Sequence, residues 1–210
     1  MNHITVKAEH EYHVHVNTHF ESALTNAAAS HNKILVVAPQ YILDHYHLEA
    51  VVNGLAGAHL FLLPDGEHQK DLSVLERIWQ TMGELGLTRS DALVAIGGGA
   101  TTDLGGFAAA TWLRGISWYA IPTTLAAMVD ASVGGKTGIN SPAGKNLIGA
   151  FHSPVAVHID LRFLDTLPDR DFAAGLAEVI KVGFIADESI LTLLEGCLLY
   201  TSDAADDTPC

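Results

Sequence analysis

The sequence predicts an α/β protein built on an open, mostly parallel sheet. Short apolar runs typical of buried parallel strands alternate with segments whose apolar residues recur at helical spacing, and turn-forming residues separate the two kinds of segment. Such alternation implies crossover connections between parallel strands. Hydrophobic residues make up 49% of the 210 and charged residues 17%. The chain can therefore bury a sizeable core, and this composition excludes intrinsic disorder.

In the first half, the alternation of polar and apolar residues over 4–16 predicts a half-buried strand, and its histidines fall on the exposed phase of an edge-like strand. Two apolar runs stopped by proline predict buried strands at 33–38 and 59–63. Helices are predicted at 20–31, at 44–55 with an end near Gly54 or Gly57, and at 72–85, which Gly86 closes.

In the second half, strands are predicted at 92–96, 117–121 and 155–159. Between positions 97 and 149 lie 11 of the 19 glycines, so we expect long parts of this stretch to be loops. Thr166 is the expected N-cap of a further helix, with Asp169 in the capping-box position. That helix covers 173–185, with Leu176, Val179, Ile180 and Phe184 as its apolar side. Glu178 and Lys181 are neighbours on one of its faces.

Charge and cysteine content limit the class of protein. The net charge of −13 repels phosphate backbones, so we expect no nucleic-acid partner, and an anionic ligand needs a local cluster of cations. The two cysteines, Cys197 and Cys210, leave the body of the chain without a disulfide framework. We find no signal-peptide pattern and no apolar run long enough for a membrane span. The expectation is a soluble, cytoplasmic protein with no membrane partner.

The glycine-rich run from Gly97 to Asp103 connects a predicted strand to a helix. Glycine in this position lets backbone N–H groups approach a pyrophosphate at the positive end of the helix, which points to a Rossmann-like nucleotide site. A tight strand-to-helix turn without a ligand is the alternative, since Thr102 replaces the third glycine of the usual fingerprint. Gly135-Lys136-Thr137 is not a P-loop, because Asp130 stands where that motif needs glycine.

Basic residues are scarce, and several lie in or beside the glycine-rich half: Arg114, Lys136, Lys145 and Lys181. Each is a candidate anion contact, with an ordinary solvated side chain as the alternative. Asp130 and Glu178 are carboxylates among apolar residues and need a partner or a role. Glu178 can ligate a divalent ion, although one carboxylate alone is weak support for a metal. The twelve histidines are interpreted as solvated surface groups rather than a metal site.

Five segments together resemble 3-dehydroquinate synthases in order and spacing. They are PDGEHQK at 64–70, GGGATTDLGGFAAATWLRG at 97–115, IPTTLAAMVDASVGGKTGIN at 121–140, GKNLIGAFHSP at 144–154 and LPDRDFAAGLAEVIKVGFI at 167–185. The resemblance covers about residues 30 to 195. It implies an NAD- and divalent-metal-dependent (zinc or cobalt) lyase of the shikimate pathway, a homodimer when full length. Its phosphorylated sugar-acid substrate, 3-deoxy-arabino-heptulosonate 7-phosphate, would be converted to 3-dehydroquinate and phosphate.

The resemblance also assigns roles residue by residue. It implies that cofactor contacts come from Asp65, Gly66, Glu67, His68, Gln69, Lys70, Gly98, Gly99, Ala100, Thr101, Thr102, Asp103, Thr123, Thr124, Lys136, Lys145, Phe163 and Thr166. It places Asp130, Lys136, Lys145, Asn146 and Lys181 in the substrate pocket, Arg114 on the substrate phosphate across the dimer interface, and Glu178 on the metal. Ala38-Pro39-Gln40 departs from the acidic or polar residue that the family often has near the adenosine ribose.

The expected organisation is an NAD-binding domain over 1–160, the start of a helical metal and substrate domain over 161–195, and a tail over 196–210 of a different character. Because no histidine follows His158, we expect the family's two histidine metal ligands to be absent, and the chain as written to be inactive. The alternatives are a nucleotide-binding module without activity, a 2-deoxy-scyllo-inosose synthase-like cyclase, and an oxidoreductase of the glycerol dehydrogenase kind.

Overall fold

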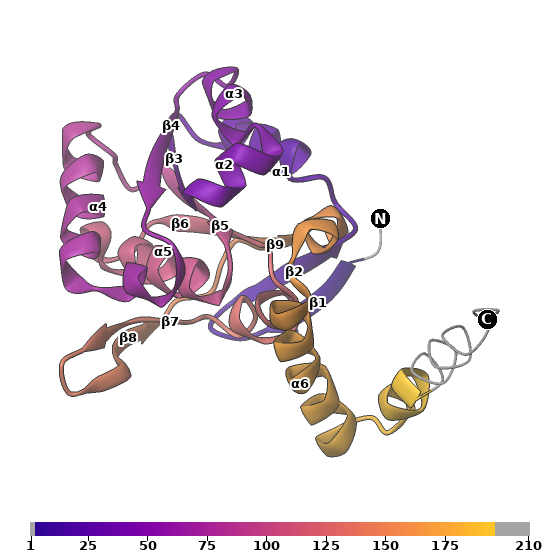
Figure 1. Cartoon of the computed structure of the whole chain (residues 1–210). Coiled ribbons are helices and arrows are strands. Elements are labelled where there is room, and N and C mark those ends of the chain that lie inside the picture. The colour runs from indigo at the N-terminus through magenta and orange to yellow at the C-terminus, as the bar shows by residue number, and fades with distance from the viewer. Residues whose placement is uncertain (1–2, 196–210) are drawn as a thin grey trace.

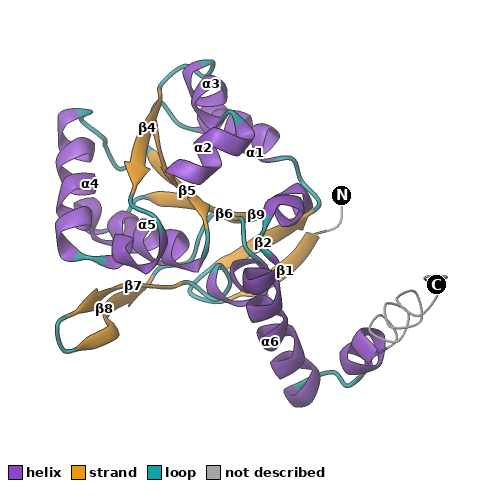
Figure 2. Cartoon of the chain, in the orientation of Figure 1, coloured by secondary structure: helices purple, strands orange, loops and turns teal. Residues whose placement is uncertain are grey.

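The computed structural model describes residues 3–195, and one seven-stranded sheet is its centre (Figures 1 and 2). The strands lie in the order β1-β2-β9-β6-β5-β3-β4. All neighbours run parallel except β1, which is antiparallel to β2. The strands are β1 (His3–Lys7), β2 (Glu11–Val16), β3 (Ile34–Pro39), β4 (Ala58–Leu63), β5 (Ala92–Gly97), β6 (Ser117–Pro122) and β9 (Ala156–Ile159). The predicted fold class is confirmed.

Helices cover both faces of the sheet. Figure 1 shows α1 to α3 grouped on one side of the central strands and α4 and α5 on the other. The helices are α1 (Phe20–Ser30), α2 (Gln40–Tyr46), α3 (Leu48–Asn53), α4 (Leu72–Glu84), α5 (Gly99–Thr111) and α6 (Asp169–Ile185). Gly86 follows α4 with φ +62, and the Leu87 N–H bonds to the Met82 carbonyl, so the predicted glycine end of this helix is confirmed.

The core lies along the central strands. All six residues of β3 and all six of β5 are buried, as expected for parallel strands covered on both faces. Trp118, Phe20 and Phe163 are among the largest fully buried side chains. No helix within residues 3–195 has the length and apolar character to cross a membrane. Both cysteines and the 196–210 segment lie outside the described residues.

Two sequence predictions for the N-terminal region are wrong. Residues 4–16 form two strands, β1 and β2, because a turn at Ala8–His10 interrupts an alternation that continues on both sides. β2 is also an internal strand between β1 and β9, so its histidines do not lie on an edge strand. Residues 44–55 form two helices rather than one, because His47 adopts φ +50 between α2 and α3.

The predicted start of the last helix is also wrong. α6 begins at Asp169 after Pro168, and no side chain caps it. Thr166 instead ends the 3-10 helix Leu161–Thr166, and its hydroxyl lies 2.6 Å from the Tyr46 hydroxyl. Proline restricts φ to values of about −65°, and Pro168 enters the helix with an extended backbone at φ −56.

The glycine-rich stretch is more regular than expected. It contains the 13-residue helix α5 and an antiparallel hairpin of β7 (Lys136–Ser141) and β8 (Gly144–Phe151), which projects from the body in Figure 1. Its glycines mark close packing: a Cβ on Gly105 would lie 2.7 Å from the Cβ of Ala95 on β5. Glycine therefore allows α5 to approach the sheet, a use that composition alone did not separate from loops.

Candidate functional site

Two cavities lie where the central parallel strands end. The first, here called the glycine groove, has a volume of about 540 Å³ and is lined by residues that follow β3, β4, β5 and β6. The chain passes from β3 outward to β4, returns to β5, and then continues to β6 on the other side. Ligands of open α/β sheets bind at such a reversal of strand order. The predicted site residues that line it are Asp65, Gly66, Glu67, Gln69, Gly98, Gly99, Ala100, Thr101, Thr123, Thr124, Phe163 and Thr166.

The N-terminus of α5 opens into this groove. Gly98 is the N-cap, and no side chain caps the helix. The first N–H groups of a helix have no partner within it, and they carry the positive end of the helix dipole. A Cβ on Gly98 would lie 3.2 Å from the Cγ2 of Thr124, and one on Gly99 would lie 3.1 Å from the Cβ of Ala131. Small residues therefore keep this helix end open to an anion.

Side-chain hydrogen bonds fix the walls of the groove. Thr101 donates to the Oε1 of Gln69 over 2.8 Å, which holds the 3-10 turn Gly66–Lys70 against α5. The hydroxyls of Tyr41 and Thr123 lie 2.8 Å apart. Burial raises the pKa of Tyr41, so its hydroxyl stays neutral. Sequence reasoning missed Tyr41 and Tyr46, because no motif marks them and their partners lie far away in the chain.

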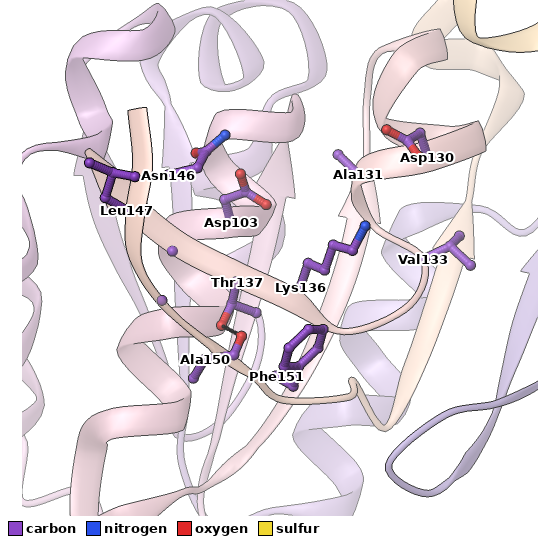
Figure 3. Close-up of a pocket in the computed structure, with 12 residues that line it drawn as sticks. Asp103, Asp130, Ala131, Val133, Lys136, Thr137, Asn146, Leu147, Ala150 and Phe151 are labelled. Atoms are coloured by element: carbon purple, nitrogen blue, oxygen red, sulfur yellow. Dashed lines mark hydrogen bonds between the residues drawn. The ribbon is translucent and has the colours of Figure 1, made fainter. Parts of the chain in front are cut away.

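The second cavity, here called the lysine cavity, has a volume of about 550 Å³ and lies beside the β7–β8 hairpin (Figure 3). It brings together four predicted site residues: Asp103, Asp130, Lys136 and Asn146. Figure 3 shows the Lys136 side chain extending from β7 into the space between the two aspartates. A lysine between two carboxylates can bind an anionic group of a substrate, while the carboxylates accept hydrogen bonds from the hydroxyl groups of the same substrate.

Lys70 connects the two cavities without lining either. Its side chain is 3% exposed, and its Nζ donates to the Oδ2 of Asp103 over 2.6 Å and also to the Oδ1 of Asn146. Burial raises the pKa of Asp103, and the bond from Lys70 opposes that shift. Lys70 therefore ties α5 to the hairpin, and its predicted cofactor contact stays a prediction.

On α6, Glu178 and Lys181 form the ion pair that their spacing predicts. The Nζ of Lys181 also lies 3.9 Å from the Oδ1 of Asp130, at the rim of the lysine cavity. The bond to Glu178 raises the pKa of Lys181. α6 reaches this position by close packing at Gly175, where a Cβ would lie 2.6 Å from the Cβ of Leu125.

The described residues do not complete a metal site around Glu178. Catalytic zinc takes three protein ligands, and within residues 3–195 no pair of further histidine or carboxylate ligands gathers at Glu178. Within residues 3–195, the group of three side chains that lie close enough together to hold a metal ion is His19, Glu21 and Asp160. Arg162 occupies it, with salt bridges of 2.6 Å to Glu21 and 2.5 Å to Asp160.

Besides Lys70, Glu178 and Lys181, four further predicted residues line neither cavity. His68 and Lys145 are exposed, and Thr102 is buried with its hydroxyl bonded to the Gly99 carbonyl at 3.0 Å. Arg114 is exposed just before β6, at the opposite edge of the sheet from the cavities. Its φ of +65 follows φ +49 at Leu113, so a strained backbone presents this arginine to solvent.

The comparisons with known proteins fit this geometry. The family model described as "3-dehydroquinate synthase N-terminal" matches residues 60–174, which is more than half of the chain. The chain belongs to this family. The 3-dehydroquinate synthase of Mycobacterium leprae (strain TN) is 49% identical over 196 residues, which cover 91% of this chain and 54% of that protein. The chain thus spans about half the length of the curated relatives it matches.

Two solved synthase structures share the fold. The 2-epi-5-epi-valiolone synthase from Streptomyces hygroscopicus subsp. jinggangensis 5008, with NAD+ and Zn2+ bound, is 32% identical with a TM-score of 0.81, over 92% of this chain and 55% of that one. A 2-deoxy-scyllo-inosose synthase complexed with carbaglucose-6-phosphate, NAD+ and Co2+ is 27% identical with a TM-score of 0.77, over 86% and 51%. These structural relatives bind NAD+ together with Zn2+ or Co2+.

Proposed function

We propose that this chain provides the nucleotide-binding half of a 3-dehydroquinate synthase, which converts 3-deoxy-arabino-heptulosonate 7-phosphate into 3-dehydroquinate and phosphate. The observation that carries the proposal is the pair of neighbouring cavities at the carboxyl edge of the sheet, one at an open helix N-terminus and one built around Lys136. The chain that contains them is 49% identical to a synthase of this name.

The glycine groove is the proposed NAD site. Its fit rests on the open N-terminus of α5 and on Gly98 and Gly99, where side chains would crowd the groove. Gly98 to Asp103 would hold the pyrophosphate, Asp65 to Lys70 the adenosine part, and Thr123 and Thr124 the nicotinamide side. NAD, when bound, supplies a hydride acceptor for the substrate alcohol at C5. The chain's own residues bind and orient the cofactor, and Tyr41 contributes a neutral hydroxyl to the groove wall.

The lysine cavity is the proposed substrate site. Lys136 offers a cation inside a chain whose net charge is −13, so it can select a phosphorylated ligand against the overall field. Asn146 enters this cavity at φ +56, held by its bond from Lys70. Asp130 and Lys181 approach from the α6 side. Lys145 and Arg114 would contribute from outside the cavity, Arg114 from a second copy in a homodimer.

Glu178 is the proposed metal ligand, in a domain that begins near residue 161. The described residues supply one ligand of the three that catalytic zinc requires, so residues 3–195 do not by themselves hold a catalytic metal. The proposed activity therefore belongs to the whole enzyme. For this chain we propose that it binds NAD and forms one wall of the substrate site.

Two measurements test the proposal. Calorimetry of this chain with NAD+ should show binding, and Lys136→Ala should retain it. The chain joined to the C-terminal half of the Mycobacterium leprae synthase should release phosphate from the heptulosonate phosphate with NAD+ and zinc or cobalt, and Lys136→Ala should abolish most of that release.

Three outcomes contradict the proposal. Phosphate release from glucose 6-phosphate instead would move the enzyme to the inosose synthase branch. Net NADH formation from glycerol would make it an oxidoreductase. NAD binding without turnover of any phosphorylated sugar would show that the protein is a nucleotide-binding module without activity of its own.

A further inference from the structure

Four histidines meet on one face of the N-terminal part of the sheet. The strand register pairs His3 of β1 with His15 of β2, and His15 with His158 of β9. His13 lies two residues from His15, so both side chains point to the same face of β2. Figure 1 shows the three strands side by side. Neither proposed cavity uses any of these residues.

The spacing of three of these imidazole rings suits binding of one metal ion. The ring centres of His3 and His13 lie 4.7 Å apart, those of His3 and His15 lie 6.2 Å apart, and those of His13 and His15 lie 6.1 Å apart. A zinc ion bound at about 2.0–2.1 Å by three imidazoles holds their ring centres roughly 5 Å apart. The three rings are therefore close to a metal-binding spacing without any movement of the backbone.

Neighbouring groups orient two of the three rings. The Thr5 hydroxyl lies 3.3 Å from the Nδ1 of His13, which leaves the Nε2 of His13 open. The His15 ring stacks on His158 at 4.9 Å with an interplanar angle of 10°.

We propose that His3, His13 and His15 form a surface site for a divalent transition metal ion of the zinc type, with a water molecule as the fourth ligand. Imidazole nitrogen is a preferred ligand of zinc, nickel and copper ions. The three ring nitrogens do not yet lie within 4.8 Å of one another, so binding requires side-chain rotation. His3 is exposed, and exposed side chains change rotamer within nanoseconds.

Titration of the 210-residue chain with Zn2+ at neutral pH, after removal of metal with a chelator, tests the site by calorimetry. We expect a saturable site that is lost in His13→Ala and in His15→Ala. His59→Ala, on the edge strand β4, is the matched control and should bind as the unaltered chain does. Thr5→Val, which removes only the orienting hydroxyl, should weaken binding on the order of tenfold.

Circular dichroism of each variant confirms that the fold is retained. His13→Ala is the decisive variant, because it leaves the stacked pair of His15 and His158 in place. Unchanged zinc affinity in His13→Ala would overturn the proposal. It would equally be overturned if Glu178→Gln alone removed the saturable site, since the zinc would then lie on α6. Loss of binding in His59→Ala to the same extent would show unspecific histidine binding and reject the site.

Discussion

The two regions that carry the candidate site are held in place in different ways. The glycine groove rests on strands such as β3 and β5, whose residues are all buried, and its walls are fixed by hydrogen bonds between distant segments. α6 buries only two residues, Gly175 and Gly183. Its predicted apolar side is largely uncovered within the described chain, with Phe184 75% and Ile180 39% exposed.

Residues of the glycine groove are thus positioned by packing, whereas residues of α6 are positioned by local helix geometry. A groove residue is held through many contacts, so a core substitution far from the groove can still displace it. Glu178 and Lys181 are placed by their helix and by the close contact at Gly175. Substitutions on the exposed side of α6 should therefore change little in the structure.

A matched pair of phenylalanines gives the largest contrast. Phe20 is 1% exposed, and its ring centre lies 5.5 Å from that of Phe163, which lines the groove. Phe20→Ala should lower the free energy of unfolding by about 3–5 kcal/mol. Phe184→Ala should change it by less than about 0.5 kcal/mol. Urea unfolding of both variants measures the two values, and an equal cost would mean that the exposed face of α6 is covered in solution.

The parallel sheet and the position of the groove could be predicted from sequence, because buried strands and a glycine run after a strand are local patterns. Lys136, Asp130 and Asn146 line one cavity, and their role as a substrate pocket stays a prediction. The contacts that shape the walls could not be predicted in this way. Tyr41 meets Thr123 and Tyr46 meets Thr166 only after the chain folds, and neither pair has a sequence signature.

Glycine content alone did not distinguish loops from close packing. The glycines over 97–149 predicted loops, but Gly105 allows close packing of α5 on the sheet and Gly138 lies in a strand of the hairpin. The expected edge position of the histidine-bearing strand was wrong for a related reason. Alternation identifies the face of a strand on which a residue lies, but not whether the strand is at an edge. The register that brings His15 onto His158 depends on strands more than 140 residues apart in the sequence.

Within the sheet, a buried histidine makes stability depend on pH. The folded-state pKa of His158 is about 4, against 6.5 for the unfolded chain, because burial and His15 disfavour its charged form. Between these values the unfolded chain binds a proton that the native chain does not, so stability falls as pH drops from 6.5 to 4. At pH 5 the loss should be roughly 1–2 kcal/mol. His158→Gln should reduce this pH dependence in urea unfolding, and identical slopes in both chains would contradict the assignment.

A smaller effect is expected for a glycine that faces the groove. Gly98→Ala places a Cβ 3.2 Å from Thr124 at the open end of α5, so NAD+ affinity should fall about tenfold, which is 1.4 kcal/mol. Gly54→Ala is the matched control, because Gly54 ends α3 at φ −78 and lies outside the groove. Calorimetry with NAD+ compares the two variants. Equal affinities would favour the tight-turn interpretation of the glycine run.

The smallest structural effect belongs to α6. Glu178→Gln removes the ion pair with Lys181, whose side chain is 49% exposed, and exposed pairs of this kind contribute little to stability. The thermal midpoint should stay within experimental error of the unaltered chain. Asp103→Asn provides the comparison, because Asp103 pairs with Lys70, which is 3% exposed, and a buried cation that loses its partner charge destabilises the fold. The midpoint should therefore drop measurably in Asp103→Asn alone. A similar drop in both variants would mean that α6 is held by its charges as firmly as the groove is held by its core.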